Sequence, residues 1–282
     1  MCGIWGYVNY GDRLNENQIA EIYTAFSNVC ITRGKHACGI AYVSGGVLSV
    51  KKAPTDLVSA NFSYPANVKM LMAHCRLSLQ KNYSNNNNNH PFCGQTFDGV
   101  KYAVEHNGIL RDLRKIRRQF HLAKTEISTD SYLIAQILNT KSRLNLQTLK
   151  EVCETLRGSF SFTVLDEKNN FYVCRGDVPI YIIHFKKLKL YLYISTRDLF
   201  EQAAATTDLW FDYKSSNLEL SAGSVNLVPT NKGTILQISP DGNLARETFI
   251  FQEEKAIRHN WYMHEITKTE ELQQQLANLE NE

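Results

Sequence analysis

The stretch that decides the fold is Met1-Cys2-Gly3-Ile4-Trp5-Gly6, which opens the chain and leads into the strand-like run Ile4–Asn9. Removal of Met1 is favoured because the next residue is small, and it exposes Cys2 as the N-terminus. The free α-amine of such a residue titrates near ~8, so it can accept the thiol proton at physiological pH. Cys2 would then supply both nucleophile and general base, and the glycines allow close backbone packing beside it. Taken alone, a cysteine after Met1 is also explained by chance or by simple burial.

The composition is that of an ordinary globular chain, with 43% hydrophobic and 21% charged residues among 282. This length suits one large domain or two small ones. The net charge of +3 is too small and too dispersed to predict binding to nucleic acid or to an anionic membrane. The basic run Arg111–Arg118 is interpreted as the solvated face of a helix. No apolar stretch approaches the ~20 residues of a membrane span, and the N-terminus does not resemble a signal peptide.

Cysteine usage predicts a reducing compartment. The chain has seven cysteines, an odd number, without regular spacing and without a Cys-x-x-Cys pair. This usage argues against a disulfide framework and against a zinc site, and no ligand cluster suggests another metal. We therefore expect a cytoplasmic protein whose important thiol stays free.

Hydrophobic periodicity predicts an α+β fold, with alternating strands and helices in the first half and mainly strands in the second. Strands are expected at Ile4–Asn9, Ile40–Val43, Val47–Lys51, Met70–His74, Lys101–His106, Phe160–Asp166, Phe171–Arg175, Tyr181–His184, Leu190–Ser195, Ser224–Val228 and Thr234–Ser239. Helices are expected at Asn15–Cys30, Leu110–Phe120, Asp130–Leu138 and Arg197–Ala205, the third of them capped by Ser128 or Thr129. This pattern predicts two sheets with helices outside them.

The domain organisation follows from composition shifts near the C-terminus. Residues 1–250 are expected to form one domain, and residues 251–282 a charged tail that is helical or partly disordered. The low-complexity run Asn85–Asn89 is polar and turn-prone, so we expect a mobile loop there.

Five short motifs follow Cys2 along the first half of the chain. They are Arg33-Gly34-Lys35-His36-Ala37-Cys38-Gly39, Ala73-His74-Cys75-Arg76, Asn89-His90-Pro91-Phe92, Glu105-His106-Asn107-Gly108-Ile109 and Ser128-Thr129-Asp130-Ser131. In this order, and with a cysteine at position 2, they resemble the class II glutamine amidotransferases, the N-terminal-nucleophile glutaminase domains. The stretches Leu156–Phe162 and Cys174–Pro179 resemble further fold markers of that family, so the resemblance spans Cys2 to Gly233.

The resemblance implies the four-layer αββα sandwich of the N-terminal nucleophile hydrolases, with Cys2 as the nucleophile. It implies that Arg76 clamps the α-carboxylate of glutamine through a bidentate contact and that Asp130 pairs with the α-ammonium. Ser78 and His106 would also lie at the substrate. Tyr132 replaces a glutamate that the family carries, which makes the Asp130 segment the weaker part of the match.

The resemblance also implies roles for the other matched positions around the reacting atoms. Asn107 and Gly108 would stabilise the oxyanion that forms when the amide carbon becomes tetrahedral. Arg33 and Gly34 would shape the pocket wall, and His90 would orient its loop by hydrogen bonds, without acting as a catalytic base.

Each of these positions also has a plain structural interpretation. Arg76 is compatible with a surface ion pair, and Asp130 with an ordinary acid at a helix N-terminus. Asn107-Gly108 predicts a tight turn, and we expect a turn there whether or not the motif is functional.

The implied reaction hydrolyses glutamine to glutamate and ammonia through a γ-glutamyl thioester on Cys2, with no metal or organic cofactor. Only about 50 residues follow Gly233, too few for the synthase domain to which relatives are fused, so we expect a separate synthase polypeptide to accept the ammonia. Two alternatives stay open. One is an amidohydrolase acting on another γ-glutamyl or related amide, and the other is a non-catalytic glutamine-binding subunit.

Overall fold

The computed structural model describes residues 2–78, 81–216, 218 and 223–252. All of these except Gln252 belong to one unit, residues 1–251. The predicted tail from residue 253 onward lies outside the described residues, so the domain boundary at residue 250 stays a prediction. No helix in the described ranges is long and apolar enough to cross a membrane.

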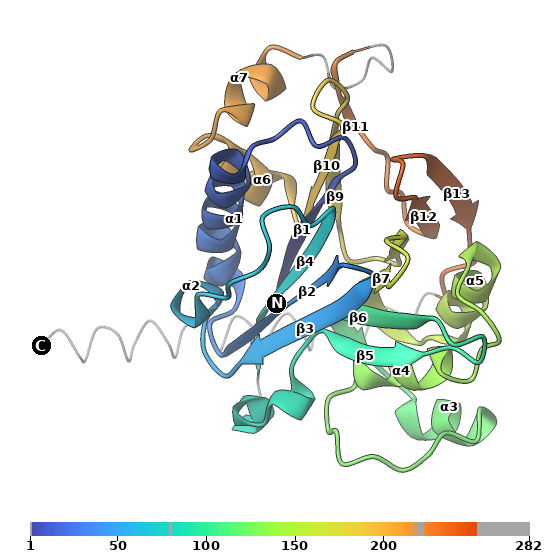
Figure 1. Ribbon diagram of the computed structural model, residues 1–282. Helices are drawn as coiled ribbons and strands as arrows, with labels where there is room; N and C mark the ends of the chain where they lie inside the picture. Colours follow the sequence, from blue (N-terminus) through green and yellow to red (C-terminus); the bar gives the residue numbers. More distant parts are fainter. Residues whose placement is uncertain (1, 79–80, 217, 219–222, 253–282) are drawn as a thin grey trace, which may run out of the picture. The chain divides into compact units, whose positions relative to one another are not determined.

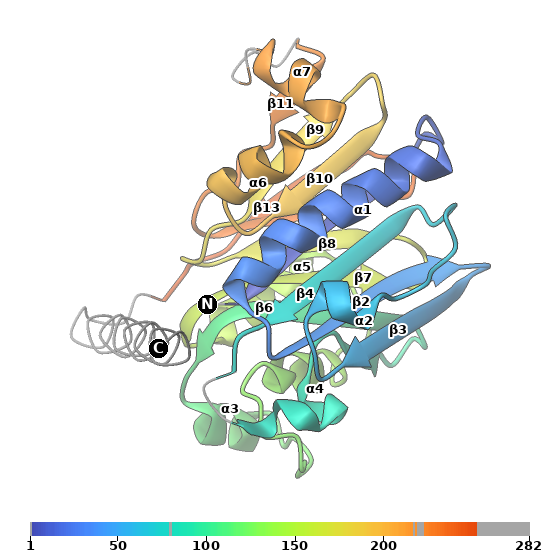
Figure 2. The ribbon, with the colours of Figure 1, turned by 90° about the vertical axis from the view of Figure 1, so that its left-hand side faces the viewer.

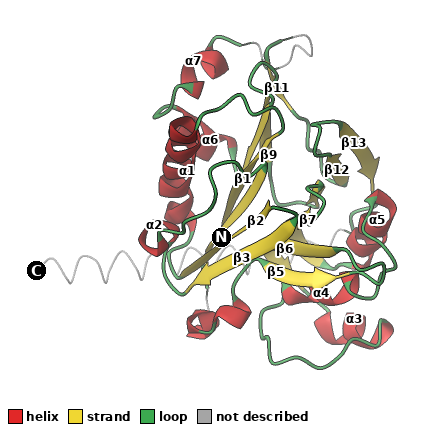
Figure 3. Cartoon of the chain, in the orientation of Figure 1, coloured by secondary structure: helices red, strands yellow, loops and turns green. Residues whose placement is uncertain are grey.

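Two antiparallel sheets form the centre of the unit (Figures 1 and 3). The first has the order β11-β9-β10-β1-β4-β2-β3, and the second has the order β13-β12-β8-β7-β6-β5. The strands of the first sheet are β1 (Gly3–Asn9), β2 (Ala37–Ser44), β3 (Val47–Ala53), β4 (Met70–Arg76), β9 (Tyr181–Phe185), β10 (Leu190–Ile194) and β11 (Val225–Leu227). Those of the second sheet are β5 (Phe92–Gln95), β6 (Lys101–Leu110), β7 (Gly158–Asp166), β8 (Phe171–Arg175), β12 (Thr234–Ile238) and β13 (Leu244–Thr248).

Helices cover the outer face of each sheet. α1 (Glu16–Cys30) and α6 (Arg197–Ala204) lie side by side on the first sheet (Figure 2) and share its apolar core with α2 (Leu57–Ala60) and α7 (Leu209–Lys214). α3 (Leu113–Gln119), α4 (Tyr132–Leu138) and α5 (Leu146–Thr155) share the core of the second sheet. A third apolar cluster lies between the sheets. The expected αββα sandwich is therefore confirmed.

The sequence of β1 shows how these layers arise. Ile4 and Val8 belong to the cluster between the sheets, whereas Trp5 and Tyr7 belong to the core under the helices. This alternation follows from the two-residue period of a strand buried on both faces. Gly6 lies on the inner face, where an added Cβ would meet the Tyr193 hydroxyl oxygen at 2.6 Å.

The expected strands and helices are all present, with ends shifted by a few residues. α2, α5, α7, β5 and β13 were not predicted. The residues of β13 are mostly exposed, so the strand exists through pairing with β12 and carries no apolar alternation. The strands predicted at Ser224–Val228 and Thr234–Ser239 lie in different sheets, so the turn between them connects the two sheets.

The turn predicted at Asn107-Gly108 is wrong, because β6 continues through both residues to Leu110. Asn107 pairs with Ser161 and Gly108 with Phe160 on β7, and this pairing keeps the backbone extended. Gly108 has φ 137°, and a Cβ there would lie 2.0 Å from the Ser159 carbonyl oxygen. Glycine is needed here for a close approach inside a strand.

Candidate active site

Cys2 lies directly before the central strand of the first sheet. β1 pairs with β4 so that Gly3 is opposite Cys75, which places Cys2 and Arg76 at the same end of neighbouring strands. Arg33 fixes this end, since its Nε donates to the Cys2 carbonyl oxygen at 2.8 Å. The Cys2 thiol lies 3.7 Å from the Leu77 carbonyl oxygen. The nucleophile position predicted from sequence is therefore adjacent to the predicted carboxylate clamp.

Electrostatics at Cys2 favour the neutral thiol. Burial raises its pKa, and the positive charges of Arg76 and Arg33 oppose that shift without reversing it. A neutral thiol is a poor nucleophile, so the site needs a base within reach. The expected base is the α-amine exposed by loss of Met1, a residue outside the described ranges.

Arg76 is a buried cation whose hydrogen-bond acceptors are all neutral. Its Nη1 donates to Asn89 Oδ1 at 2.6 Å, and its Nη2 donates to Asn82 Oδ1 at 2.8 Å and to Thr129 Oγ1 at 3.2 Å. Only 6% of the residue is exposed. The surface ion pair considered for Arg76 is thus excluded, because a buried guanidinium is held by three uncharged oxygens.

The Asn85–Asn89 run is an ordered part of the site, contrary to the expected mobile loop. Asn86–Asn88 form a 3-10 helix, and Asn88 and Asn89 are buried. Asn89 Nδ2 donates to the Tyr83 carbonyl oxygen at 2.7 Å, and Asn88 Oδ1 accepts from the Ser128 amide at 2.8 Å. Asparagine suits both tasks because one short side chain offers a donor and an acceptor. The run therefore connects Arg76 to the segment that carries Asp130.

Asp130 lies just before α4 and is bonded to β6. Its Oδ2 accepts from the Leu110 amide at 2.6 Å, and the charge of Asp130 acts on Arg76. The predicted capping by Ser128 or Thr129 is wrong. The N-cap position of α4 is Ser131, which makes no side-chain cap bond, whereas Thr129 Oγ1 donates to the Asn88 carbonyl oxygen at 2.8 Å. Tertiary contacts with the Asn run replace local capping here.

Asn107 presents its amide group without a partner among the described residues. It is 1% exposed, and neither its Oδ1 nor its Nδ2 forms a hydrogen bond there. A buried polar group with no partner is costly, so such a group at a candidate site points to a ligand. β6, which carries Asn107, packs against β1, which follows Cys2. The donor predicted for the oxyanion is therefore available, although the position is a strand and not a turn.

Three buried histidines, His74, His90 and His106, lie close together. The rings of His74 and His90 stack with centroids 4.0 Å apart, His74 Nε2 donates to the His106 carbonyl oxygen at 3.2 Å, and His106 Nδ1 is bonded to Ser131 Oγ at 2.7 Å. Burial lowers the pKa of all three, that of His74 to about 3, so the stack is neutral.

This stack corrects the expectation for His90, which was to orient its loop by hydrogen bonds. Neither ring nitrogen of His90 has a partner in the described part of the chain, so His90 acts by packing. The His106 ring is enclosed and bonded to the protein. Among the described residues, no group of three or more His, Cys, Asp or Glu is placed to hold a metal ion.

The remaining predicted residues line the same region. A Cβ on Gly34 would lie 2.4 Å from the Arg76 carbonyl carbon, so only glycine lets the two backbones approach. The Ser78 amide donates to His36 Nδ1 at 3.0 Å, and Ser78 Oγ donates to Asn82 Oδ1 at 3.1 Å. The structure thus places Arg33, Gly34 and Ser78 beside Cys2 and Arg76.

The sequence interpretation assigned no site role to Asn82, Asn88 and Asn89, nor to the pair formed by His36 and Tyr83, whose ring centroids lie 5.0 Å apart. The sequence did contain a signal for the role of the Asn run. The run lies between the motif of Arg76 and that of His90, and two motifs of one site are more readily held together by an ordered segment than by a mobile loop.

Comparison with known proteins bears on the family and the fold of the chain. Residues 74–198 match the family described as glutamine amidotransferase domain. This segment is therefore similar to glutamine amidotransferase domains. The chain also superimposes on the glutamine phosphoribosylpyrophosphate amidotransferase of B. subtilis with a TM-score of 0.65 and 18% identity, covering 89% of this chain and 50% of that one. The chain therefore shares the fold of that amidotransferase, with two sheets between helical layers.

Two curated proteins that are similar to this chain are named as synthases. The 7-cyano-7-deazaguanine synthase of Sulfolobus acidocaldarius is 24% identical over 211 residues, which make up 71% of this chain and 44% of that protein. The 7-cyano-7-deazaguanine synthase 2 of Sulfurisphaera tokodaii is 25% identical over 180 residues, or 61% and 38% of the two chains. The chain thus spans less than half the length of the curated relatives that it matches.

Proposed function

We propose that this protein hydrolyses the side-chain amide of glutamine through a γ-glutamyl thioester on Cys2. The observation that carries the proposal is the position of Cys2 beside the buried guanidinium of Arg76, at one end of β1 and β4. Among the described residues no carboxylate accepts a hydrogen bond from this cation, and the α-carboxylate of an amino acid would supply such an acceptor.

The proposed reaction proceeds in two steps at one carbon. The α-amine of Cys2 takes the thiol proton, and the sulfur attacks the amide carbon to give a tetrahedral oxyanion stabilised by Asn107 and the Gly108 amide. The ammonium gives its proton to the amide nitrogen, and collapse of this intermediate breaks the C–N bond and releases ammonia. Water then attacks the thioester, gives its proton to the amine, and releases glutamate and the free thiol.

The proposed substrate contacts follow from the charges around Cys2. Arg76 would take the α-carboxylate and Asp130 the α-ammonium, with Ser78 near the first of these groups. Asn82 Oδ1 and Thr129 Oγ1 now accept from the same guanidinium nitrogen. Glutamine would replace at least one of these neutral acceptors with a charged one, which makes the stronger hydrogen bond.

The direct test is ammonia release from glutamine by the protein after loss of Met1, which mass spectrometry of the intact chain should verify. Cys2→Ala should abolish ammonia release and leave the fold intact by circular dichroism. Cys93→Ala, at an exposed cysteine on β5, is the matched control and should retain full activity. Activity that persists in Cys2→Ala, or an active form that keeps Met1, would refute the mechanism.

We further propose that the ammonia passes to a synthase on a separate polypeptide. Support comes from the curated relatives, which are named 7-cyano-7-deazaguanine synthases. Glutamine hydrolysis without an acceptor is wasteful, so activity should rise when the partner binds. Affinity purification from the native source should recover a synthase in stoichiometric amount, and an isolated, fully active glutaminase would contradict this.

A second candidate is an amidohydrolase whose substrate lacks a free α-ammonium. It is favoured by the bond from the Leu110 amide to Asp130, which already occupies one carboxylate oxygen, and by Tyr132 in place of an acid. A panel of glutamine and N-blocked γ-glutamyl amides, with ammonia as the readout, separates the two candidates. Binding of glutamine without turnover would instead indicate a regulatory subunit.

A further inference from the structure

The segment between β6 and Asp130 carries a concentrated positive charge that the proposed reaction does not use. Residues 111–126 hold six Lys or Arg and two Asp or Glu, a net charge of +4 in a chain whose net charge is +3. Four of these cations line one hollow of about 820 Å³ on α3 and the loop after it. They are Arg114, Arg117, Arg118 and Lys124.

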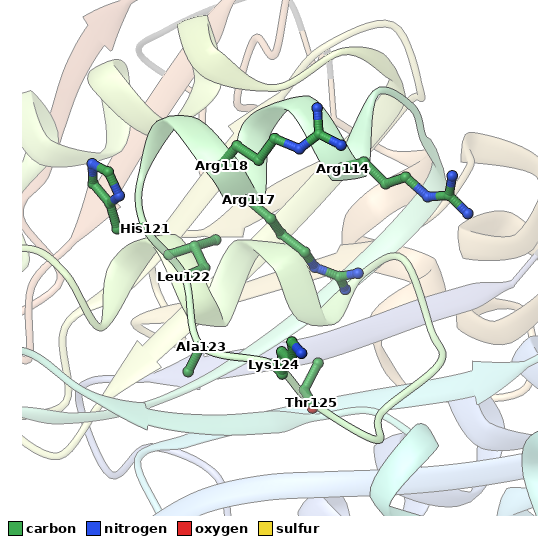
Figure 4. A pocket seen from close by; sticks show the side chains of 8 residues that line it. All are labelled: Arg114, Arg117, Arg118, His121, Leu122, Ala123, Lys124 and Thr125. Atoms are coloured by element: carbon green, nitrogen blue, oxygen red, sulfur yellow. The ribbon is translucent and has the colours of Figure 1, made fainter.

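The cations of this hollow have no acidic partner in the described part of the chain. The ion pairs found there join Lys141 to Glu151, Lys150 to Glu247 and Arg197 to Glu201. The remaining lining residues are His121, Leu122, Ala123 and Thr125, none of which is an acid. Figure 4 shows Arg117 extending from α3 toward the loop that carries Lys124 and Thr125, with Arg114 and Arg118 on the same helix.

The hollow is held in shape by a buried glutamine. Gln136 on α4 is 8% exposed, its Oε1 accepts from Arg117 Nε at 3.3 Å, and its Nε2 donates to the Ala123 carbonyl oxygen at 2.9 Å. One side chain therefore fixes both the helix wall and the loop wall. A surface whose charges are positioned before binding loses less conformational entropy when a partner docks.

We propose that this hollow docks a carboxylate-rich segment of the polypeptide that accepts the ammonia. This partner assignment rests on the proposed function, whereas the charge and shape of the hollow do not. Arginines in a fixed arrangement form bidentate contacts with carboxylates, and arginine is enriched at protein interfaces. The exposed charges would also steer an acidic partner toward this face.

The lining argues against other anionic ligands. Small-molecule sites are mostly apolar and enclose their ligand, whereas Leu122 and Ala123 are the apolar residues of this lining. Single-stranded nucleic acid is bound with aromatic side chains on which bases stack, and the lining contains no Phe, Tyr or Trp. Duplex binding uses many phosphate contacts over a long surface, and this cluster is confined to one short helix and its loop.

The position of the hollow gives docking a route to the proposed active site. The segment leaves β6 directly after the Asn107 strand, and its far end is tied back by the bond from the Leu110 amide to Asp130. A partner that holds this segment would therefore contact an element whose two ends adjoin the strand of Asn107 and Asp130.

The test uses the full chain as Cys2→Ala protein and a fluorescein-labelled oligo-glutamate peptide of about ten residues, a length that can span the four cations. Anisotropy should show salt-sensitive binding to this protein. In the variant that adds Arg114→Glu, Arg118→Glu and Lys124→Glu the Kd should rise about tenfold or more. The matched control reverses the same number of charges at exposed positions elsewhere, namely Arg13→Glu, Lys69→Glu and Lys187→Glu, and should bind like the parent.

Three results would overturn the assignment. They are equal losses of binding in the two triple variants, no peptide binding at all, and tighter binding of a single-stranded oligonucleotide or of tripolyphosphate than of the peptide. The same triple variant with Cys2 intact should hydrolyse glutamine within about twofold of wild type, which shows that it is folded. Because peptide binding is measured without turnover, a failed glutaminase assay and a failed docking assay are distinguishable.

Discussion

Arg76 and the arginines of α3 are chemically alike but lie in opposite surroundings. Arg76 is buried, and three neutral side-chain oxygens hold its guanidinium in one place. Arg114 and Arg118 are exposed and form no ion pair with any described residue. Burial of a charge is expensive, so a buried cation is fixed by the fold for a ligand of defined shape. An exposed cation has a small desolvation penalty, and its charge can attract a partner during diffusional encounter.

The largest effect is expected at Arg76. Arg76→Met should lower kcat/KM for glutamine about a hundredfold or more, because two charge-assisted hydrogen bonds to the α-carboxylate are lost. The variant should also unfold at lower urea concentration, since Asn89, Asn82 and Thr129 lose their donor. Arg118→Met is the matched control and should change neither quantity by more than about twofold. Similar losses in both variants would mean that the buried and the exposed arginine do not differ in their importance for glutamine hydrolysis.

The second effect is on the chemical step. Asn107→Ala should lower kcat about 10²-fold with little change in KM, as expected for a donor that acts on the oxyanion. Its stability should change little, because the Asn107 amide has no partner to lose among the described residues. Steady-state kinetics against Asn67→Ala, an exposed asparagine, measures this effect. A rise in KM with unchanged kcat would instead assign Asn107 to substrate binding.

A smaller effect concerns a buried carboxyl group between the sheets. Glu105 Oε1 accepts from Thr163 Oγ1 at 2.8 Å and from the Tyr193 hydroxyl at 3.0 Å, and burial raises the pKa of Glu105 to about 8. The unfolded chain ionises this group at lower pH than the folded protein. The contribution of Glu105 to stability is therefore greatest below about pH 4.5 and falls as pH rises toward 8.

Glu105→Gln should remove that pH dependence, because glutamine is neutral at every pH. The advantage of the variant in the free energy of unfolding should grow by about 1 kcal/mol per pH unit between roughly pH 6 and 8. Urea titrations at several pH values measure it, with Glu126→Gln as an exposed control. A constant difference across this range would show that Glu105 is ionised in the folded protein.

The smallest effect is expected at Asn82, because its Oδ1 accepts from Arg76 and would compete with glutamine for this cation. Asn82→Ala should tighten glutamine binding about fivefold in Cys2→Ala protein, because one neutral hydrogen bond need not be broken. Calorimetry measures the change. Asn89→Ala should weaken binding, since Asn89 is buried and orients the other nitrogen of the guanidinium. Weaker binding in both variants would mean that Asn82 holds Arg76 in its binding position.

The sequence alone was sufficient to predict the layers of the fold and the residues that lie near the proposed nucleophile Cys2. Alternating apolar residues in β1, β7 and β10 and the periodic apolar face of α1 are local signals, so they predict the strands and helices that build the sandwich. Cys2, Arg76 and Asn107 were found because each belongs to a short motif. Chain order and spacing could not show that Asn107 lies within a strand, since the pairing with β7 that keeps it extended comes from residues about 50 positions later.

Only the tertiary structure decided the environment of each charged or polar group. Asn88 and Asn89 look like a disordered run in sequence, yet they bond Arg76 and the Ser128 segment across the site. The α3 cations look like an ordinary solvated helix face, yet Gln136 of another helix sets them around a hollow. Polar side chains take their function from partners distant in the chain, whereas apolar periodicity is set by neighbours. For this reason the sequence determined the fold and the position of the proposed nucleophile, and tertiary contacts determined which polar residues surround it.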